Sequence, residues 1–192
     1  MNIMWNIKHV YRTVRPEVMV LVFLVSYLIL MFFINKEKRK QGAKISRVDC
    51  VAVLCLAVCI TAILGGTLLN RIVGQGFEVM LIPFWSYWET IVLGDWVLGE
   101  QIVFNVLIFV PFGTLAPIPF SRVRNFTKML VIVTIFSVGV EIMQLLFRCG
   151  TCEFDDVFSN VLGTIIGYGL WKGSCNIWKT YSSRRKEKNI VC

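Results

Sequence analysis

Histidine is almost absent from this chain, and charged residues are scarce. His9 is the single histidine among 192 residues, and only 17% of the residues are Asp, Glu, Lys or Arg. Cys149 and Cys152 form a Cys-x-x-Cys pair, but no second pair and no second histidine complete a zinc-binding pattern. Soluble domains carry about 25% charged residues. The low charged fraction therefore argues against a water-soluble globule.

Apolar residues dominate instead, at 56% of the chain and a mean hydropathy of +0.69. They gather in segments near the length of about 20 residues that a helix needs to cross a bilayer. Five such segments are present, roughly Val18–Ile34, Cys50–Leu69, Ile102–Phe120, Met129–Phe147 and Val157–Trp171. The pattern predicts an all-α fold, a polytopic membrane helical bundle with five transmembrane helices.

The segments divide the chain into three parts. Residues 1–47 hold the first transmembrane helix and a basic cytoplasmic loop, residues 48–171 form the membrane domain, and residues 172–192 form a basic cytoplasmic tail. The tail is polar and charged, which predicts disorder. Between the second and third segments, the loop Asn70–Gln101 is rich in Trp, Tyr and Phe, which favour the membrane interface. We expect an external interfacial loop with a short amphipathic helix around Ser86–Leu98.

The distribution of Lys and Arg predicts the orientation of the chain. Residues 35–47, residues 121–128 and the tail after Trp171 hold six, three and six of them, and alternating spans place all three stretches on one side. The other side receives five. Cytoplasmic loops carry the excess of Lys and Arg, so the tail is expected in the cytoplasm and the N-terminus outside. The basic stretch Met1–Arg15 fits this orientation poorly, and an interfacial helix along the membrane surface is the alternative there.

The net charge of +8 does not indicate nucleic-acid binding. The cations lie next to apolar runs, and no zinc finger, RNA-binding aromatic motif or other nucleic-acid module is present. We therefore expect no nucleic-acid partner.

Polar residues inside the apolar segments are the main candidates for function, because ionisable groups in lipid cost about 2.5–3.5 kcal/mol each on insertion scales. A rise of about 1.5 Å per residue brings polar groups from three segments to one height near the external face. Glu141, Gln144 and Arg148 share one helix face, and Asp156 and Asn160 share another. The candidate ligand-binding residues are Asn105, Glu141, Gln144, Arg148, Asp155, Asp156 and Asn160.

These side chains have a purely structural alternative, since buried amides and carboxylates also hold membrane helices together by hydrogen bonds worth about 0.6 kcal/mol on average. Gly163 and Gly167 form a small-xxx-small pair that lets another helix approach closely. A homodimer through these two glycines is one way to use the pair. A transporter is a further hypothesis, although the sequence has no internal repeat of the kind that carriers use.

Four sequence blocks resemble, in the same order, those of the VanZ-like family of teicoplanin-resistance membrane proteins. They are Leu81–Phe84 (LIPF), Asn105–Gly113 (NVLIFVPFG), Ser137–Gln144 (SVGVEIMQ) and Asp155–Gly163 (DDVFSNVLG). The resemblance covers about Val48–Trp171, so residues 48–171 are similar to the family's membrane domain and the first apolar segment is an addition to its usual four-span core. Glu153 stands where the family commonly has Asp.

The resemblance implies a multi-pass protein of the bacterial cell membrane that is linked to reduced susceptibility to teicoplanin-type lipoglycopeptides. From the residues we expect a polar pocket in the outer leaflet that binds an amphipathic or lipid-linked ligand. The expected partners are a membrane lipid, a lipid-linked wall precursor or a lipoglycopeptide, and no cofactor is needed.

The alternative is a membrane enzyme that modifies a lipid or a cell-wall precursor. Glu141 would then be a general base or metal ligand, and Asp155 with Asp156 would hold Mg²⁺. No nucleophile motif accompanies these carboxylates, so the sequence leaves open whether the protein catalyses a reaction.

Overall fold

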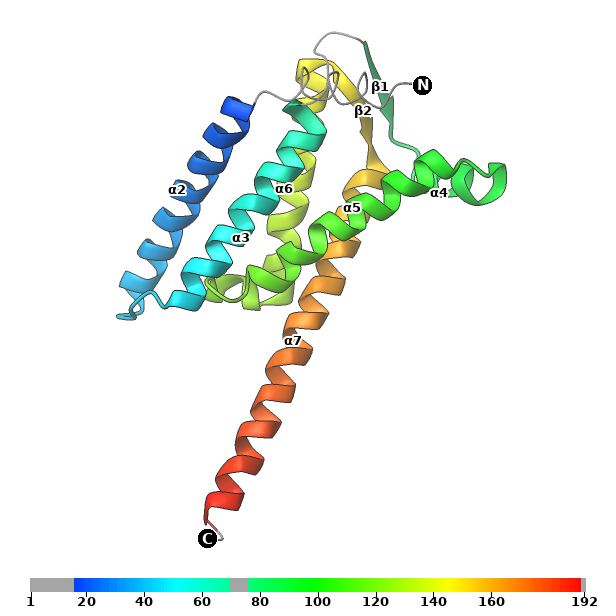
Figure 1. The fold of residues 1–192 in the computed structure, drawn as a ribbon. Helices are drawn as coiled ribbons and strands as arrows, with labels where there is room; N and C mark the ends of the chain where they lie inside the picture. Colours follow the sequence, from blue (N-terminus) through cyan, green and yellow to red (C-terminus); the bar gives the residue numbers. More distant parts are fainter. Residues whose placement is uncertain (1–15, 70–75, 191–192) are drawn as a thin grey trace, which may run out of the picture.

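The computed structural model describes residues 16–69 and 76–190, with the side chains of residues 76–77 and 182–190 left aside. In chain order the elements are α2 (Pro16–Lys40), α3 (Arg47–Leu64), the π-helical turn η1 (Gly65–Leu69), β1 (Gly76–Met80), α4 (Trp85–Trp88), the π-helical turn η2 (Glu89–Leu93), α5 (Trp96–Leu115), the 3₁₀ turn η3 (Ser121–Arg124), α6 (Phe126–Phe147), β2 (Cys149–Glu153) and α7 (Phe154–Ile190). Figure 1 shows these helices as one bundle, which confirms the all-α fold. The interfacial helix considered for Met1–Arg15 lies outside the described residues.

Four helices within the described residues are long and apolar enough to cross a membrane. They are α2, the continuous stretch Arg47–Leu69, α5 and α6. The fifth predicted span, Val157–Trp171, is not among them, so the count of five is not confirmed. This stretch is shorter than the roughly 20 residues of a full span, and it belongs to a helix that begins with two aspartates. The orientation of the chain in the membrane stays a prediction.

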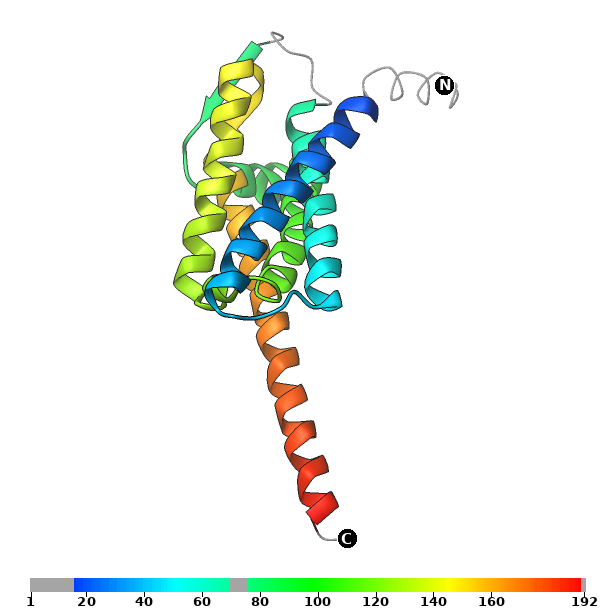
Figure 2. The same ribbon diagram turned by 90° about the vertical axis from the view of Figure 1, so that its left-hand side faces the viewer.

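Helix α7 is a single helix of 37 residues that extends far past the other helices (Figures 1 and 2). The disorder predicted for residues 172–192 therefore differs from the structure, in which the helix continues to Ile190. The costly step in helix formation is nucleation, and the bundle has already nucleated this helix before the tail begins. The tail is also rich in Lys, Arg and Glu, which are good helix formers.

The first half of α7 packs most extensively on α5. A Cβ added at Gly163 would collide with the carbonyl oxygen of Val106, and a Cβ added at Gly167 would collide with that of Val110. The close helix approach predicted for the glycine pair therefore occurs inside one chain. Because α5 already occupies this face, the two glycines are not free to meet a second copy, which corrects the dimer contact expected from sequence. Whether the protein forms a homodimer by another surface stays a prediction.

The core of the bundle is built from buried apolar residues of four helices. Leu56 of α3, Phe109 of α5, Met129 of α6 and Tyr168 of α7 belong to one buried cluster. Outside this cluster many large apolar side chains are exposed, including Phe32 of α2 at 62%. Exposed apolar area on this scale marks an interaction with lipid or another protein, and it fits helices that span a bilayer.

Two short strands, which sequence analysis did not predict, join distant parts of the chain. Strand β1 pairs in parallel with β2, so that Gly76 lies opposite Cys149 and Met80 opposite Glu153. The Cys-x-x-Cys pair lies on β2. The pairing brings the segment before α4 to the end of α6, and α4 then lies beside the bundle on the side away from α2 (Figure 1).

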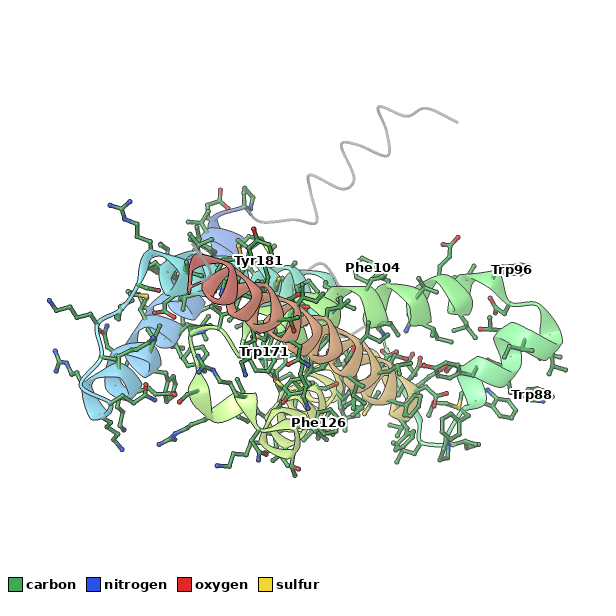
Figure 3. All side chains as sticks on the ribbon, turned by 90° about the horizontal axis from the view of Figure 1, so that it is seen from below. Trp88, Trp96, Phe104, Phe126, Trp171 and Tyr181 are labelled. Atoms are coloured by element: carbon green, nitrogen blue, oxygen red, sulfur yellow. The ribbon has the colours of Figure 1, made fainter. Side chains whose placement is uncertain are left out.

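The amphipathic helix expected around Ser86–Leu98 is divided in the structure. Helix α4 and the turn η2 end at Gly94, whose positive φ of 72° is easily adopted only by glycine. Asp95 then caps a new helix, α5, by accepting a hydrogen bond from the Val97 amide at 3.0 Å. The chain reverses at this point, and Trp88 and Trp96 lie at the same end of the molecule, away from α2 (Figure 3).

Candidate functional site

Asp155, in the first turn of α7, fixes the start of α4. Its two carboxylate oxygens accept hydrogen bonds from the backbone amides of Phe84 at 2.7 Å and Ser86 at 2.8 Å. Phe84 has a left-handed backbone (φ 62°), and its side chain gives α4 no cap. The carboxylate of Asp155, only 2% exposed, supplies that cap from a distant helix. Asp155 thus positions α4, and its predicted role as a ligand-binding residue stays a prediction.

A chain of hydrogen bonds continues from α4 through β2 to α6. The Ser86 hydroxyl donates to Glu153 at 3.0 Å, and the Glu153 amide donates to the carboxylate of Glu141 at 3.1 Å. All three residues are buried. Ser86 and Glu153 were not among the predicted site residues. Glu153 lies two residues before Asp155, and its proximity to the acidic pair was the signal that could have included it.

Asp156, the next residue after Asp155, forms its hydrogen bond with a different helix, α5. Its carboxylate accepts a hydrogen bond from Asn105 of α5 at 2.7 Å, and Gln101 stands one helical turn earlier with a longer contact of 3.5 Å. Successive residues of a helix point in different directions, so two adjacent aspartates can serve two different elements. Gln101 was not among the predicted site residues, although its spacing of four residues from Asn105 places both on one face.

Asn160, one turn after Asp156, is buried between α6 and α7 and is 6% exposed. Its amide nitrogen donates to the Ser137 hydroxyl at 2.8 Å. Its oxygen, Oδ1, is buried and has no hydrogen-bond partner among the described residues. A buried acceptor without a donor costs about 1–3 kcal/mol, which is the kind of defect that a ligand or water repairs.

A cavity of about 140 Å³ lies where these side chains meet. It is enclosed by α3, α5, α6 and α7 together with the turn η1. Four of the seven predicted residues line it: Asn105, Glu141, Asp156 and Asn160. The remaining wall is mostly apolar and includes Phe104, Ile108, Phe109, Ile63 and Val140. Gln101 and Thr67 line it as well, so the wall combines two carboxylates, three amides and a hydroxyl with an apolar surround. We call this space the polar cavity.

The other predicted residues lie outside that lining. Gln144 is buried, and its amide nitrogen donates to the backbone oxygen of Thr67 in η1 at 3.3 Å, while its own oxygen has no partner among the described residues. Arg148 ends α6 in a left-handed conformation with φ 50°. Asp155 holds α4. The structure therefore divides the predicted set into four residues that line the polar cavity and three that lie around it.

The electrostatic environment above the polar cavity is negative. Burial raises the pKa of the Tyr87 hydroxyl, and the charges of Asp155 and Asp156 raise it further, although its hydrogen bond with Ser159 at 2.7 Å lowers it. The rise in pKa keeps Tyr87 protonated. The two carboxylates beside this phenol make the region one that favours positive charge.

The thiol of Cys152 lies near the same group of negative charges. Burial raises the pKa of its thiol, and the carboxylates of Glu141, Asp156 and Glu153 raise it further. Cys152 is a free thiol in the structure. Because the thiolate is the reactive form of cysteine, a raised pKa makes Cys152 a poor nucleophile near neutral pH.

Alkylation of Cys152 by iodoacetamide should therefore be slower at pH 8 than alkylation of free cysteine. Its pH profile should be centred above the ordinary thiol value of about 8.5. Glu153→Gln removes one of the negative charges and should move the profile toward lower pH. Mass spectrometry of the peptide that contains Cys152 measures both rates. A profile centred at or below about 8.5 would contradict the negative field.

The carboxylates fit the magnesium alternative poorly. That alternative needs Asp155 together with Asp156, yet both oxygens of Asp155 already accept backbone amides and Asp156 accepts from Asn105. Within residues 16–69 and 76–190, no group of three His, Cys, Asp or Glu side chains is arranged to hold a metal ion. The geometry therefore supports no reaction step through a divalent cation, while the absence of a cofactor stays a prediction.

Comparison with known proteins agrees with the sequence blocks. The model of a family described as VanZ/LLP1 matches residues 18–179. Protein VanZ of Enterococcus faecium is 32% identical over 72 residues, which make up 38% of this chain and 44% of that protein. The match thus spans less than half of the relative's length. No solved structure matches the chain.

Proposed function

Because the chain belongs to the VanZ/LLP1 family, we propose that it is a membrane binding protein that lowers susceptibility to teicoplanin-type lipoglycopeptides. The polar cavity would hold the head group of an amphipathic or lipid-linked molecule. The observation that carries the proposal is the meeting of Asn105, Glu141, Asp156 and Asn160 at one space enclosed by four helices. If the chain has the orientation that its Lys and Arg distribution predicts, the polar cavity lies near the outer face of the membrane.

The size of the polar cavity limits what it can hold. Sites for whole small molecules are about 300–1,000 Å³, whereas this one is about 140 Å³. A head group fits this volume, and the remainder of an amphipathic ligand would lie along the apolar helix surfaces or beneath the aromatic segment that Asp155 holds. A wall precursor carried on a lipid and a lipoglycopeptide with an acyl chain both have this form.

The chemistry of the lining favours a ligand that donates hydrogen bonds. Glu141 and Asp156 are acceptors when ionised, and Oδ1 of Asn160 is an acceptor that still lacks a donor. An amino or ammonium group would satisfy Oδ1 and offset the negative field. A bare phosphate would bring further negative charge beside two carboxylates, so a cationic or N–H-bearing group is the better match.

Removing either carboxylate should abolish the resistance. Glu141→Gln and Asp156→Asn keep the size of each side chain, and each should return the minimal inhibitory concentration of teicoplanin to that of a host without the gene. Vancomycin sensitivity should not change. The control is Glu100→Gln, which removes an exposed carboxylate from α5 outside the polar cavity. Full resistance in either variant, at parental abundance in the membrane, would refute the proposal.

A second variant tests the space itself and leaves every polar group in place. Gly66 lines the polar cavity, and a Cβ built on it meets no atom within 4 Å. Gly66→Phe should therefore place a bulky ring at the opening and abolish the resistance. Gly139 of α6 has equally open surroundings but does not line the cavity, so Gly139→Phe is the matched control.

A further inference from the structure

A second, larger cavity lies at the opposite end of the bundle from the polar cavity. Its volume is about 440 Å³, within the range of about 300–1,000 Å³ found for small-molecule sites. The end of α2, the middle of α3, the end of α5 and the start of α6 enclose it, near the lower end of the bundle in Figure 1. Its wall is mostly apolar and includes Leu30, Phe33, Leu56, Phe112, Met129 and Ile132.

The rim of this cavity is cationic. Lys36, Lys40 and Arg122 line it and are exposed, and none of them forms an ion pair with another described residue. By contrast Lys38, on another face of α2, is paired with Asp49 at 2.8 Å. The rim therefore offers three unneutralised positive charges from two separate segments of the chain.

One carboxylate, Glu37, also lines the cavity, but it already accepts hydrogen bonds from other residues of the chain. Its Oε1 accepts hydrogen bonds from the Ser121 amide at 2.8 Å and from the Ser121 hydroxyl, and Gln41 donates to the same oxygen at 3.3 Å. These contacts tie α2 to η3 and hold the carboxylate on the protein. The charge that remains at the rim for a ligand is positive.

We propose that this cavity binds one anionic phospholipid, with an acyl chain in the apolar part and the phosphate at Lys36, Lys40 and Arg122. An apolar wall that ends in a ring of cations matches the two halves of such a lipid. Lys and Arg bury their stems along apolar surface and keep their charged ends at the interface, where the phosphate lies. Basic pockets between transmembrane helices bind anionic head groups for the same reason.

The exposure of the neighbouring helices favours a lipid over a protein partner. Helix α2 makes its main contact with α3, and only 6% of its apolar window is buried in the chain. Ile132 of α6, on the other side of the cavity, is 47% exposed. In a membrane these surfaces face lipid directly, so a lipid can enter from the side.

Lipid titration of the purified full-length protein in a neutral detergent tests the proposal. Native mass spectrometry should show tighter binding of phosphatidylglycerol than of phosphatidylcholine. Lys36→Gln, Lys40→Gln and Arg122→Gln should each weaken phosphatidylglycerol binding by about fivefold and leave phosphatidylcholine binding unchanged. Lys128→Gln removes an exposed cation at the same end of the bundle but outside the rim, and it should have no effect.

The apolar half of the site has its own pair of variants. Ile132→Trp adds bulk at the cavity wall and should weaken binding, whereas Ile135→Trp on the exposed face of α6 should not. Glycerol 3-phosphate, which has no acyl chain, should fail to displace the lipid. Equal binding of the two lipids, an equal effect of Lys128→Gln, or displacement by glycerol 3-phosphate would each overturn the assignment. None of these residues lines the polar cavity, so the outcome is independent of the proposed function.

Discussion

Replacing Gly163 with alanine should destabilise the protein by about 1–3 kcal/mol or more, because this close helix contact has no space for a methyl group. The new methyl group would collide with the backbone of Val106, whose carbonyl oxygen cannot rotate away as a flexible side chain would. The helices α5 and α7 would have to move apart, and the contacts at Gly167 and Gly113 would loosen with them. Thermal unfolding in detergent measures the loss.

Gly169 provides the matched control on the same helix. A Cβ at this exposed position meets no atom within 4 Å. Gly169→Ala should therefore raise stability by about 0.5–1 kcal/mol, because glycine is a poor helix former. If both alanine variants behaved alike, the packing of the glycine face on α5 would not be the main contact between these helices.

Replacing Asp155 with alanine should release the segment that contains α4. The backbone amides of Phe84 and Ser86 would each lose a buried acceptor, at a cost of about 1–3 kcal/mol per group. Because Asp155 connects α4 to α7 and not α7 to the bundle, we expect local opening before global unfolding. Hydrogen exchange at residues 84–88 should accelerate by at least about tenfold, since about 1.4 kcal/mol corresponds to that factor.

Asp95→Ala is the comparison for this second result. Asp95 also caps a helix through its carboxylate, but it is exposed and its partners, Val97 and Leu98, can bond to water or headgroups instead. Loss of this cap should cost only about 1 kcal/mol, with the effect confined to the first turn of α5. Unchanged exchange at Phe84 and Ser86 in the Asp155→Ala protein would show that other contacts hold α4, such as the hydrogen bonds of Ser86 and Tyr87.

The lining of the polar cavity could be predicted in part because helices have a fixed rise and period. Asn105, Glu141 and Asn160 come to one space from three helices, as their depths in the apolar segments indicated. Helix periodicity does not predict which residue each polar side chain forms a hydrogen bond with. Asp155 and Asp156 are neighbours in sequence, yet one serves α4 and the other serves Asn105.

The partner of Asp155 depends on a contact between distant parts of the chain. The segment before α4 reaches the first turn of α7 because β1 pairs with β2, and the sequence of these short strands carries no alternating pattern that would predict the pairing. The glycine pair illustrates the same limit. Its spacing predicted that a helix would approach closely, but α5 of the same chain and a second copy satisfy that spacing equally well.

The length of α7 has a mechanical consequence. Its first turns carry Asp156 and Asn160 at the polar cavity, and the same unbroken helix runs to Ile190, about 45–50 Å away at about 1.5 Å per residue. The close packing of Gly163 and Gly167 on α5 fixes one point of α7 between its two ends. A small tilt at the upper end is therefore converted into a larger sweep of the lower end, and Tyr181, exposed on the projecting arm, is well placed to carry a probe that reads it.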